Sequence, residues 1–139
     1  ALCFQMNEFK YPDIESCISI LDKLGIDKDK LDLECQDWEY TLADERYLKS
    51  YIKLYSNDKT TKLEKRVLGC FIIQCLQDIL VEGAKENYVI KILTMLSKDM
   101  EIHKYEFEYW SLLEDENYIE HEEDCWHITK LIRTFVVKA

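Results

Sequence analysis

Hydrophobic residues recur every three or four positions along most of this 139-residue chain, which is the spacing of an amphipathic helix. The pattern predicts six helices, at residues 11–24, 43–55, 61–81, 87–97, 100–113 and 119–137. Residues 26–42 alternate only in part and are compatible with a loop, a short strand or a helical turn. No internal repeat or interdomain linker interrupts the pattern.

The segment 61–81 carries the strongest pattern. Thr61 is followed three residues later by Glu64, which is the spacing of a capping box. Between residues 67 and 76 the segment is apolar nearly all round, which is typical of a central, buried helix. Gly69 within it predicts a close approach to a neighbouring helix. The residues that we expect in the core are Val67, Phe71, Ile72, Cys75, Leu76 and Ile79.

Turn residues mark the ends of several of these segments. Pro12 is placed in the first turn of the first helix, and Gly25 and Gly83 follow the ends of the first and third helices. The sequence therefore predicts an all-α, single-domain bundle of about six helices over residues 6–139, with a minor N-terminal β element as the alternative for part of it. Residues 1–5 resemble the remnant of a protease site from an expression tag; the alternative is native sequence that has lost its initiator methionine.

Composition narrows the function classes. The chain has 28 acidic and 18 basic residues, a net charge of −10, which argues against nucleic acid as a direct ligand. No apolar run is long enough to span a bilayer, and the N-terminus lacks the features of a secretory signal. Six cysteines occur without a Cys-x-x-Cys pair, so we expect a reduced, cytoplasmic protein.

The acidic residues are unevenly distributed. Residues 105–129 hold nine of them, no lysine or arginine, and six large aromatic residues. Acids that steer encounter and aromatics that anchor contact are what a binder of a basic protein surface requires. The alternative is a solvated face whose aromatics point into the core, which the helical spacing of Tyr105 and Tyr109 favours. The predicted partner-binding residues are Trp110, Glu114, Asp115, Glu116, Tyr118, Glu120, Glu122, Glu123 and Asp124.

Signals for catalysis or metal binding are weak. His121 and Cys125 lie four residues apart, and a zinc pair has this spacing, but no third ligand accompanies them. Glu120 and Glu123 form a single Glu-x-x-Glu pair without a partner motif. Phosphate-binding loops and nucleophile motifs are lacking. We therefore expect no enzyme activity, no catalytic residues, no metal and no cofactor; a small metal-dependent hydrolase is the least favoured alternative.

Residues 37–82 resemble small helical bacterial proteins, some of which resemble immunity proteins of toxin systems. The residues that carry this resemblance are Asp37-Trp38-Glu39-Tyr40, Ala43-Asp44, Arg46, Tyr51-Ile52, Tyr55 and Glu64-Lys65-Arg66-Val67-Leu68. The resemblance implies a cytoplasmic protein that blocks a toxin domain made by its own cell. We therefore expect an acidic module that neutralises a basic partner, most concretely a nuclease-type toxin domain, and the alternative is a helical adaptor or scaffold.

Overall fold

The computed structural model describes residues 8–27, 38–112 and 125–136. Its elements are α1 (Ile14–Leu24), α2 (Trp38–Thr41), the 3-10 helix η3 (Glu45–Tyr47), α3 (Leu48–Tyr55), α4 (Lys62–Val81), α5 (Glu86–Ser97), α6 (Met100–Ser111) and α7 (Thr129–Val136). No strand occurs among the described residues, so the predicted all-α class is confirmed and the N-terminal β element is not seen.

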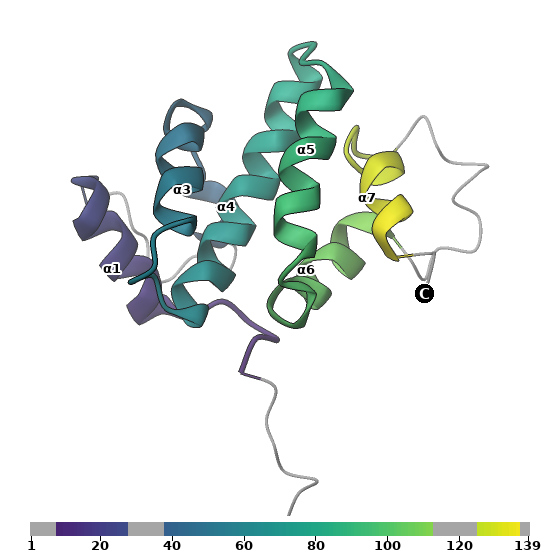
Figure 1. The fold of residues 1–139 in the computed structure, drawn as a ribbon. Coiled ribbons are helices and arrows are strands. Elements are labelled where there is room, and N and C mark those ends of the chain that lie inside the picture. The colour runs from purple at the N-terminus through teal and green to yellow at the C-terminus, as the bar shows by residue number, and fades with distance from the viewer. Residues whose placement is uncertain (1–7, 28–37, 113–124, 137–139) are drawn as a thin grey trace, which may run out of the picture.

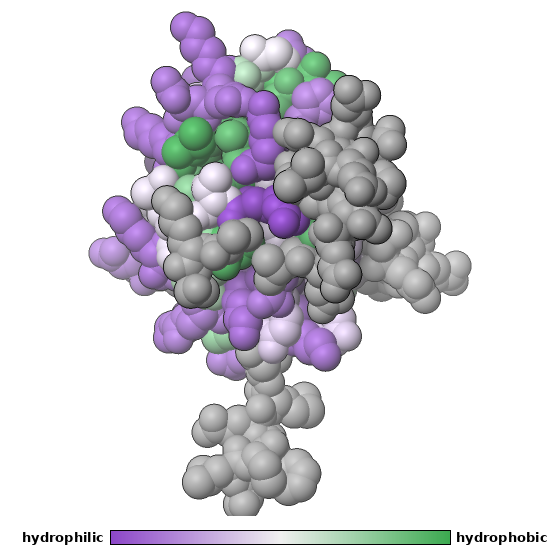
Figure 2. Space-filling view, turned by 90° about the vertical axis from the view of Figure 1, so that its right-hand side faces the viewer, coloured by the Kyte–Doolittle hydropathy of each residue, from purple (hydrophilic) through white to green (hydrophobic). Residues whose placement is uncertain are grey.

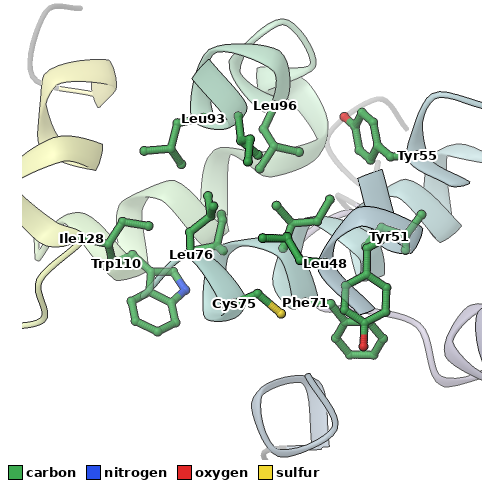
Figure 3. Packing of buried hydrophobic residues seen from close by; sticks show 14 of the residues in the cluster. Leu48, Tyr51, Tyr55, Phe71, Cys75, Leu76, Leu93, Leu96, Trp110 and Ile128 are labelled. Atoms are coloured by element: carbon green, nitrogen blue, oxygen red, sulfur yellow. The ribbon is translucent and has the colours of Figure 1, made fainter. Parts of the chain in front are cut away.

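Helix α4 is the centre of the bundle. It packs against α1, α2, η3, α3, α5 and α6, whereas α7 packs against α5 and α6. Figure 1 shows α1 and α3 on one side of α4 and α5 on the other, with α7 beyond α5. The buried residues of these helices form one continuous hydrophobic cluster (Figure 3). No described helix is both long and apolar enough to cross a membrane.

The sequence signals for α4 are confirmed. Thr61 accepts a hydrogen bond from the Glu64 backbone N–H, and the Glu64 side chain accepts one from the Thr61 backbone, which completes the capping box. Five of the six predicted core residues on this helix have no exposed surface. Ile79 is the exception: it is half-buried and packs against the edge of the cluster, because α4 emerges toward solvent in its last turn.

Helix boundaries differ from the predictions by one or two residues at several ends and by more in three places. Asp13 caps α1 by accepting a hydrogen bond from the Ser16 backbone N–H, so Pro12 precedes the helix instead of lying in its first turn. The segment 43–55 begins with η3, because Asp44 caps a 3-10 turn before α3 starts. In the segment 119–137, residues 125–128 are not helical, and α7 begins only at residue 129; residues 119–124 and 137 lie outside the described part.

Residues 26–42, for which three conformations remained open, contain the short helix α2. Residues 28–37 lie outside the described part. Helix α2 has no fully buried residue, yet it packs against α4. A helix of four residues is too short to be stable alone, so its position depends on these tertiary contacts.

Gly69 allows α4 and α6 to approach closely, as predicted. A Cβ atom built on Gly69 would lie 2.5 Å from both Cε1 and Nδ1 of His103, a separation that real Cβ atoms essentially never show. His103 lies on α6 and is completely buried, so its ring has no room to withdraw. The only residue that fits at this crossing is therefore glycine.

We predict that Gly69→Ala destabilises the protein by about 1–3 kcal/mol, because the added methyl group overpacks the core. Alanine is otherwise the better helix former by about 1 kcal/mol, so a simple propensity argument predicts the opposite sign. Chemical denaturation of the single variant and of Gly69→Ala combined with His103→Ala distinguishes the two. The penalty should disappear when the imidazole is removed; an additive double variant would contradict the proposed clash.

Candidate partner-binding site

The structure places one of the nine predicted partner-binding residues. Trp110 lies on α6 and is 3% exposed, so it does not meet the condition of exposure on which its role as a surface anchor depends. Its indole N–H donates to Glu106 Oε2 at 3.0 Å, which explains how the polar end of the ring is accommodated in the interior. Glu114, Asp115, Glu116, Tyr118, Glu120, Glu122, Glu123 and Asp124 lie outside the described residues.

Tyr109, rather than Trp110, is the exposed aromatic residue of α6. Its ring is 48% exposed and stacks on Tyr40 of α2, with the ring centroids 5.5 Å apart. The Trp110 and Trp126 rings complete this aromatic cluster, with their centroids 4.6 Å apart. The cluster joins α2, α6 and the residues before α7. Helical spacing placed Tyr109 in the core, but it could not reveal that α2 covers only one face of the ring.

A cavity of about 350 Å³ opens beside this aromatic cluster. Its lining residues are Lys10, Tyr11, Pro12, Glu39, Tyr40, Arg66, Tyr105, Glu106 and Tyr109. Four tyrosines therefore contribute to one depression, and two of them, Tyr11 and Tyr109, are among the exposed large hydrophobic residues of the described part. Their rings offer apolar faces with polar ends, a combination that is enriched at protein interfaces.

The inner wall of this tyrosine-lined cavity contains a buried ion pair. Arg66 Nη1 lies 3.1 Å from Glu106 Oε1, and both side chains are at most 3% exposed. The guanidinium group also donates to the backbone carbonyls of Phe9 and Lys10, and to the Cys70 sulfur. These bonds satisfy the buried charge and fix the chain that leads into α1. The ion pair is therefore a structural element of the cavity.

A second depression, of about 560 Å³, lies where η3 meets the C-terminal end of α4. Its lining residues are Thr41, Leu42, Ala43, Asp44, Glu45, Asp78, Val81 and Glu82. We call it the acidic pocket, because four of these eight residues are carboxylates and none is cationic. Sequence analysis missed it, since its two halves lie more than thirty residues apart in the chain.

Repulsion within the acidic pocket is only partly relieved. Asp44 is paired with Arg46, at 2.6 Å between Oδ2 and Nη2. The hydrogen-bonding contact with Glu82 raises the pKa of Glu45, because two carboxyl groups this close are more stable when they share a proton. Oε2 of Glu45 is shielded from solvent, and within the described ranges no N–H group donates to it.

The position of the acidic pocket on α4 adds to this repulsion. Asp78 and Glu82 are spaced four residues apart at the C-terminal end of the helix, where the backbone carbonyls carry partial negative charge. Like charges at this spacing are themselves destabilising. The last turn of α4 carries no basic residue. Two acids at the wrong end of a helix are the sequence signal that could have found this site.

In the described part of the chain, no group of three or more His, Cys, Asp or Glu residues could hold a metal ion. Cys125 is half-buried and His127 is exposed, whereas His121, Glu120 and Glu123 lie outside the described residues. Among the described residues visible on the side of α7, most are hydrophilic, and the hydrophobic ones form separate patches (Figure 2).

Comparison with protein-family models, curated proteins and solved structures gave no match to this chain. Function is therefore argued from the two depressions and the charge distribution.

The buried ion pair yields a prediction about stability. Glu106→Gln should lower the free energy of unfolding by about 3–5 kcal/mol, because Arg66 would keep its buried charge without the carboxylate that compensates it. The matched control is Glu101→Gln on the same helix, whose carboxylate pairs with Lys62 at the surface and is 66% exposed. That change should cost less than about 1 kcal/mol. Similar losses for the two variants in urea denaturation would contradict the structural role of the pair.

Proposed function

We propose that this protein is an acidic binding module that neutralises a basic protein partner. In its most specific form the proposal is an immunity protein that occludes the nucleic-acid-facing surface of a nuclease-type toxin domain. Carboxylates would then stand in for the phosphates that such a surface binds. The resemblance of residues 37–82 to small helical bacterial proteins, some of which resemble immunity proteins, suggests this form of the proposal.

The observation that carries the proposal is the acidic pocket. Asp78 and Glu82 repel each other, meet the negative end of α4, and face Glu45 across the pocket. This arrangement lowers the stability of the free protein, since a compact structure gains nothing from concentrated like charge. A cationic group from a partner would offset both the repulsion between these carboxylates and their unfavourable position at the negative end of α4.

The apolar part of the pocket indicates the kind of cation. Val81 of α4 lines the acidic pocket and is 59% exposed, and Leu42 lines it from the segment before η3. Lysine and arginine place an aliphatic stem along apolar surface and keep the charge at its end. A pocket with apolar walls and carboxyl groups therefore suits one such side chain of a basic protein better than a free metal ion.

The uneven charge along the chain supports the same proposal. Nine of the 28 acids fall within residues 105–129, which contain no lysine or arginine. One of the nine, Glu106, is buried and paired with Arg66, so it does not add to the surface charge. Charges of this kind act chiefly on the rate of encounter, whereas buried anchors act on the lifetime of the complex. Tyr109 takes the role of aromatic anchor that Trp110 cannot fill.

The decisive experiment first identifies the partner by affinity capture from the native host and then measures binding with purified components. We predict that the double variant Glu45→Gln/Glu82→Gln weakens the complex by roughly tenfold while making the free protein slightly more stable to heat, because it removes repulsion that only the partner compensates. The control is Glu15→Gln/Asp58→Asn, which removes two exposed acids elsewhere. Equal loss of affinity in both variants would show that only net charge matters.

A second prediction concerns the acidic residues of the stretch 105–129. Charge reversal at Glu120, Glu122 and Glu123 should slow association more than it speeds dissociation, and raised salt should reduce the association rate of the unmodified protein. Surface plasmon resonance at two ionic strengths measures both effects. An unchanged association rate in the triple variant would leave this segment as solvated surface only.

Inhibition of the captured partner separates the immunity proposal from an adaptor role. An immunity protein should abolish the activity of a nuclease partner at equimolar concentration. An adaptor should bind its partner and leave the activity intact.

A further inference from the structure

His103 is a completely buried ionisable group at the crossing of α4 and α6. It lies on α6 with no exposed surface, and its ring rests on Gly69 of α4. Its Nε2 atom lies 2.7 Å from the Tyr55 hydroxyl of α3, and this hydroxyl donates to Asp99 Oδ2 at 2.6 Å. The imidazole thus connects three helices at one point.

The hydrogen bonds determine where the imidazole proton lies. A tyrosine hydroxyl has one proton, and the Tyr55 proton is given to Asp99. The Tyr55 oxygen must then accept from His103, so Nε2 carries the hydrogen. Nδ1 is left as a bare, buried nitrogen, and no group of the described residues forms a hydrogen bond with it. It faces Gly69, which offers no acceptor side chain.

The surrounding groups oppose a second proton on this ring. Arg66 and Lys65 of α4 act on the ring by repulsion, whereas Asp99, before α6, attracts the protonated form. Asp99 is already engaged by Tyr55, and burial raises the pKa of this hydroxyl, so it keeps its proton. Burial, followed by the repulsion from Arg66, lowers the pKa of His103 to about 3.

We propose that the contact between His103 and Gly69 is a pH-sensitive device that holds α6 against α4 only while the imidazole is neutral. A proton on Nδ1 has no acceptor at this crossing, so the protonated ring requires α6 to move away from α4. Helix α6 also carries Glu106 and Tyr109, which line the tyrosine-lined cavity. Acidification should therefore loosen this cavity before the rest of the bundle unfolds.

The direction and size of the effect follow from linkage. The imidazole is neutral in the folded state and has a pKa near 6.5 once it is exposed, so the opened state binds the additional proton. Stability from this contact is complete above pH 6.5 and is lost as the pH falls toward 3. Within that range each pH unit should favour opening by about tenfold, the change expected for one proton.

Hydrogen exchange of the intact protein tests this device. In the unmodified protein, protection of the α6 amides, corrected for intrinsic exchange, should fall by about tenfold between pH 6 and pH 5, a window above the usual range of carboxyl titration. His103→Gln keeps a donor near Tyr55 but cannot be protonated, so this fall should disappear. His127→Gln, which changes the exposed histidine, should behave like the unmodified protein. The same fall in all three proteins would overturn the proposal.

Nuclear magnetic resonance of the histidine ring nitrogens gives a second test that needs no variant. The proposal requires that His103 carries its proton on Nε2 and stays neutral in the folded protein at pH 5. A ring that is protonated on Nδ1 at neutral pH, or that titrates near pH 6.5 while the fold persists, would overturn it even if His103→Gln does not fold.

Discussion

Because α4 is buried on nearly every side, its buried Glu64, Arg66 and Gln77 side chains rely on partners from other elements. Glu64 binds Ser19 and Lys23 of α1, and Arg66 binds the backbone before α1 together with Glu106 of α6. Farther along, Gln77 accepts the backbone N–H of Ile128, just before α7. Hydrophobic burial gathers the helices around α4, and these bonds fix where α1, α6 and the residues before α7 lie along it. An unpaired partner would leave a desolvated polar group, which costs more than most single contacts contribute.

This dependence explains which parts of the fold could be predicted. Local signals in the sequence identified the Thr61 capping box, the core positions of α4 and the close approach at Gly69, because each depends on residues within one helix. The sequence favoured exposure of Trp110 and burial of Tyr109, and the structure shows the opposite. Their burial depends on Tyr40 and Trp126 from distant segments. Periodicity indicates which face of a helix is covered, but it does not indicate how far the covering element extends.

The candidate site shows the same limit. Counting charges along the sequence located the acid-rich residues 105–129, because their nine acids lie close together in the chain. It could not locate the acidic pocket, because Asp44 and Glu45 meet Asp78 and Glu82 only after η3 packs against α4. A local rule did point there, however. Acids at the C-terminal end of a helix oppose its dipole, and departures from such rules mark places where another requirement prevails.

The attachment of α7 has a consequence for how the protein can change over evolutionary time. Arg133 of α7 donates to the carbonyls of Ser111 and Leu112 at the end of α6, and Thr129 donates to the carbonyl of Trp110. Thr129 and Arg133 therefore specify the contact between α6 and α7 by binding main-chain carbonyls, which every amino acid supplies. The α6 positions can change their side chains and keep these bonds, whereas the two α7 positions cannot. Over evolutionary time Thr129 and Arg133 should therefore vary less than the exposed positions of α7.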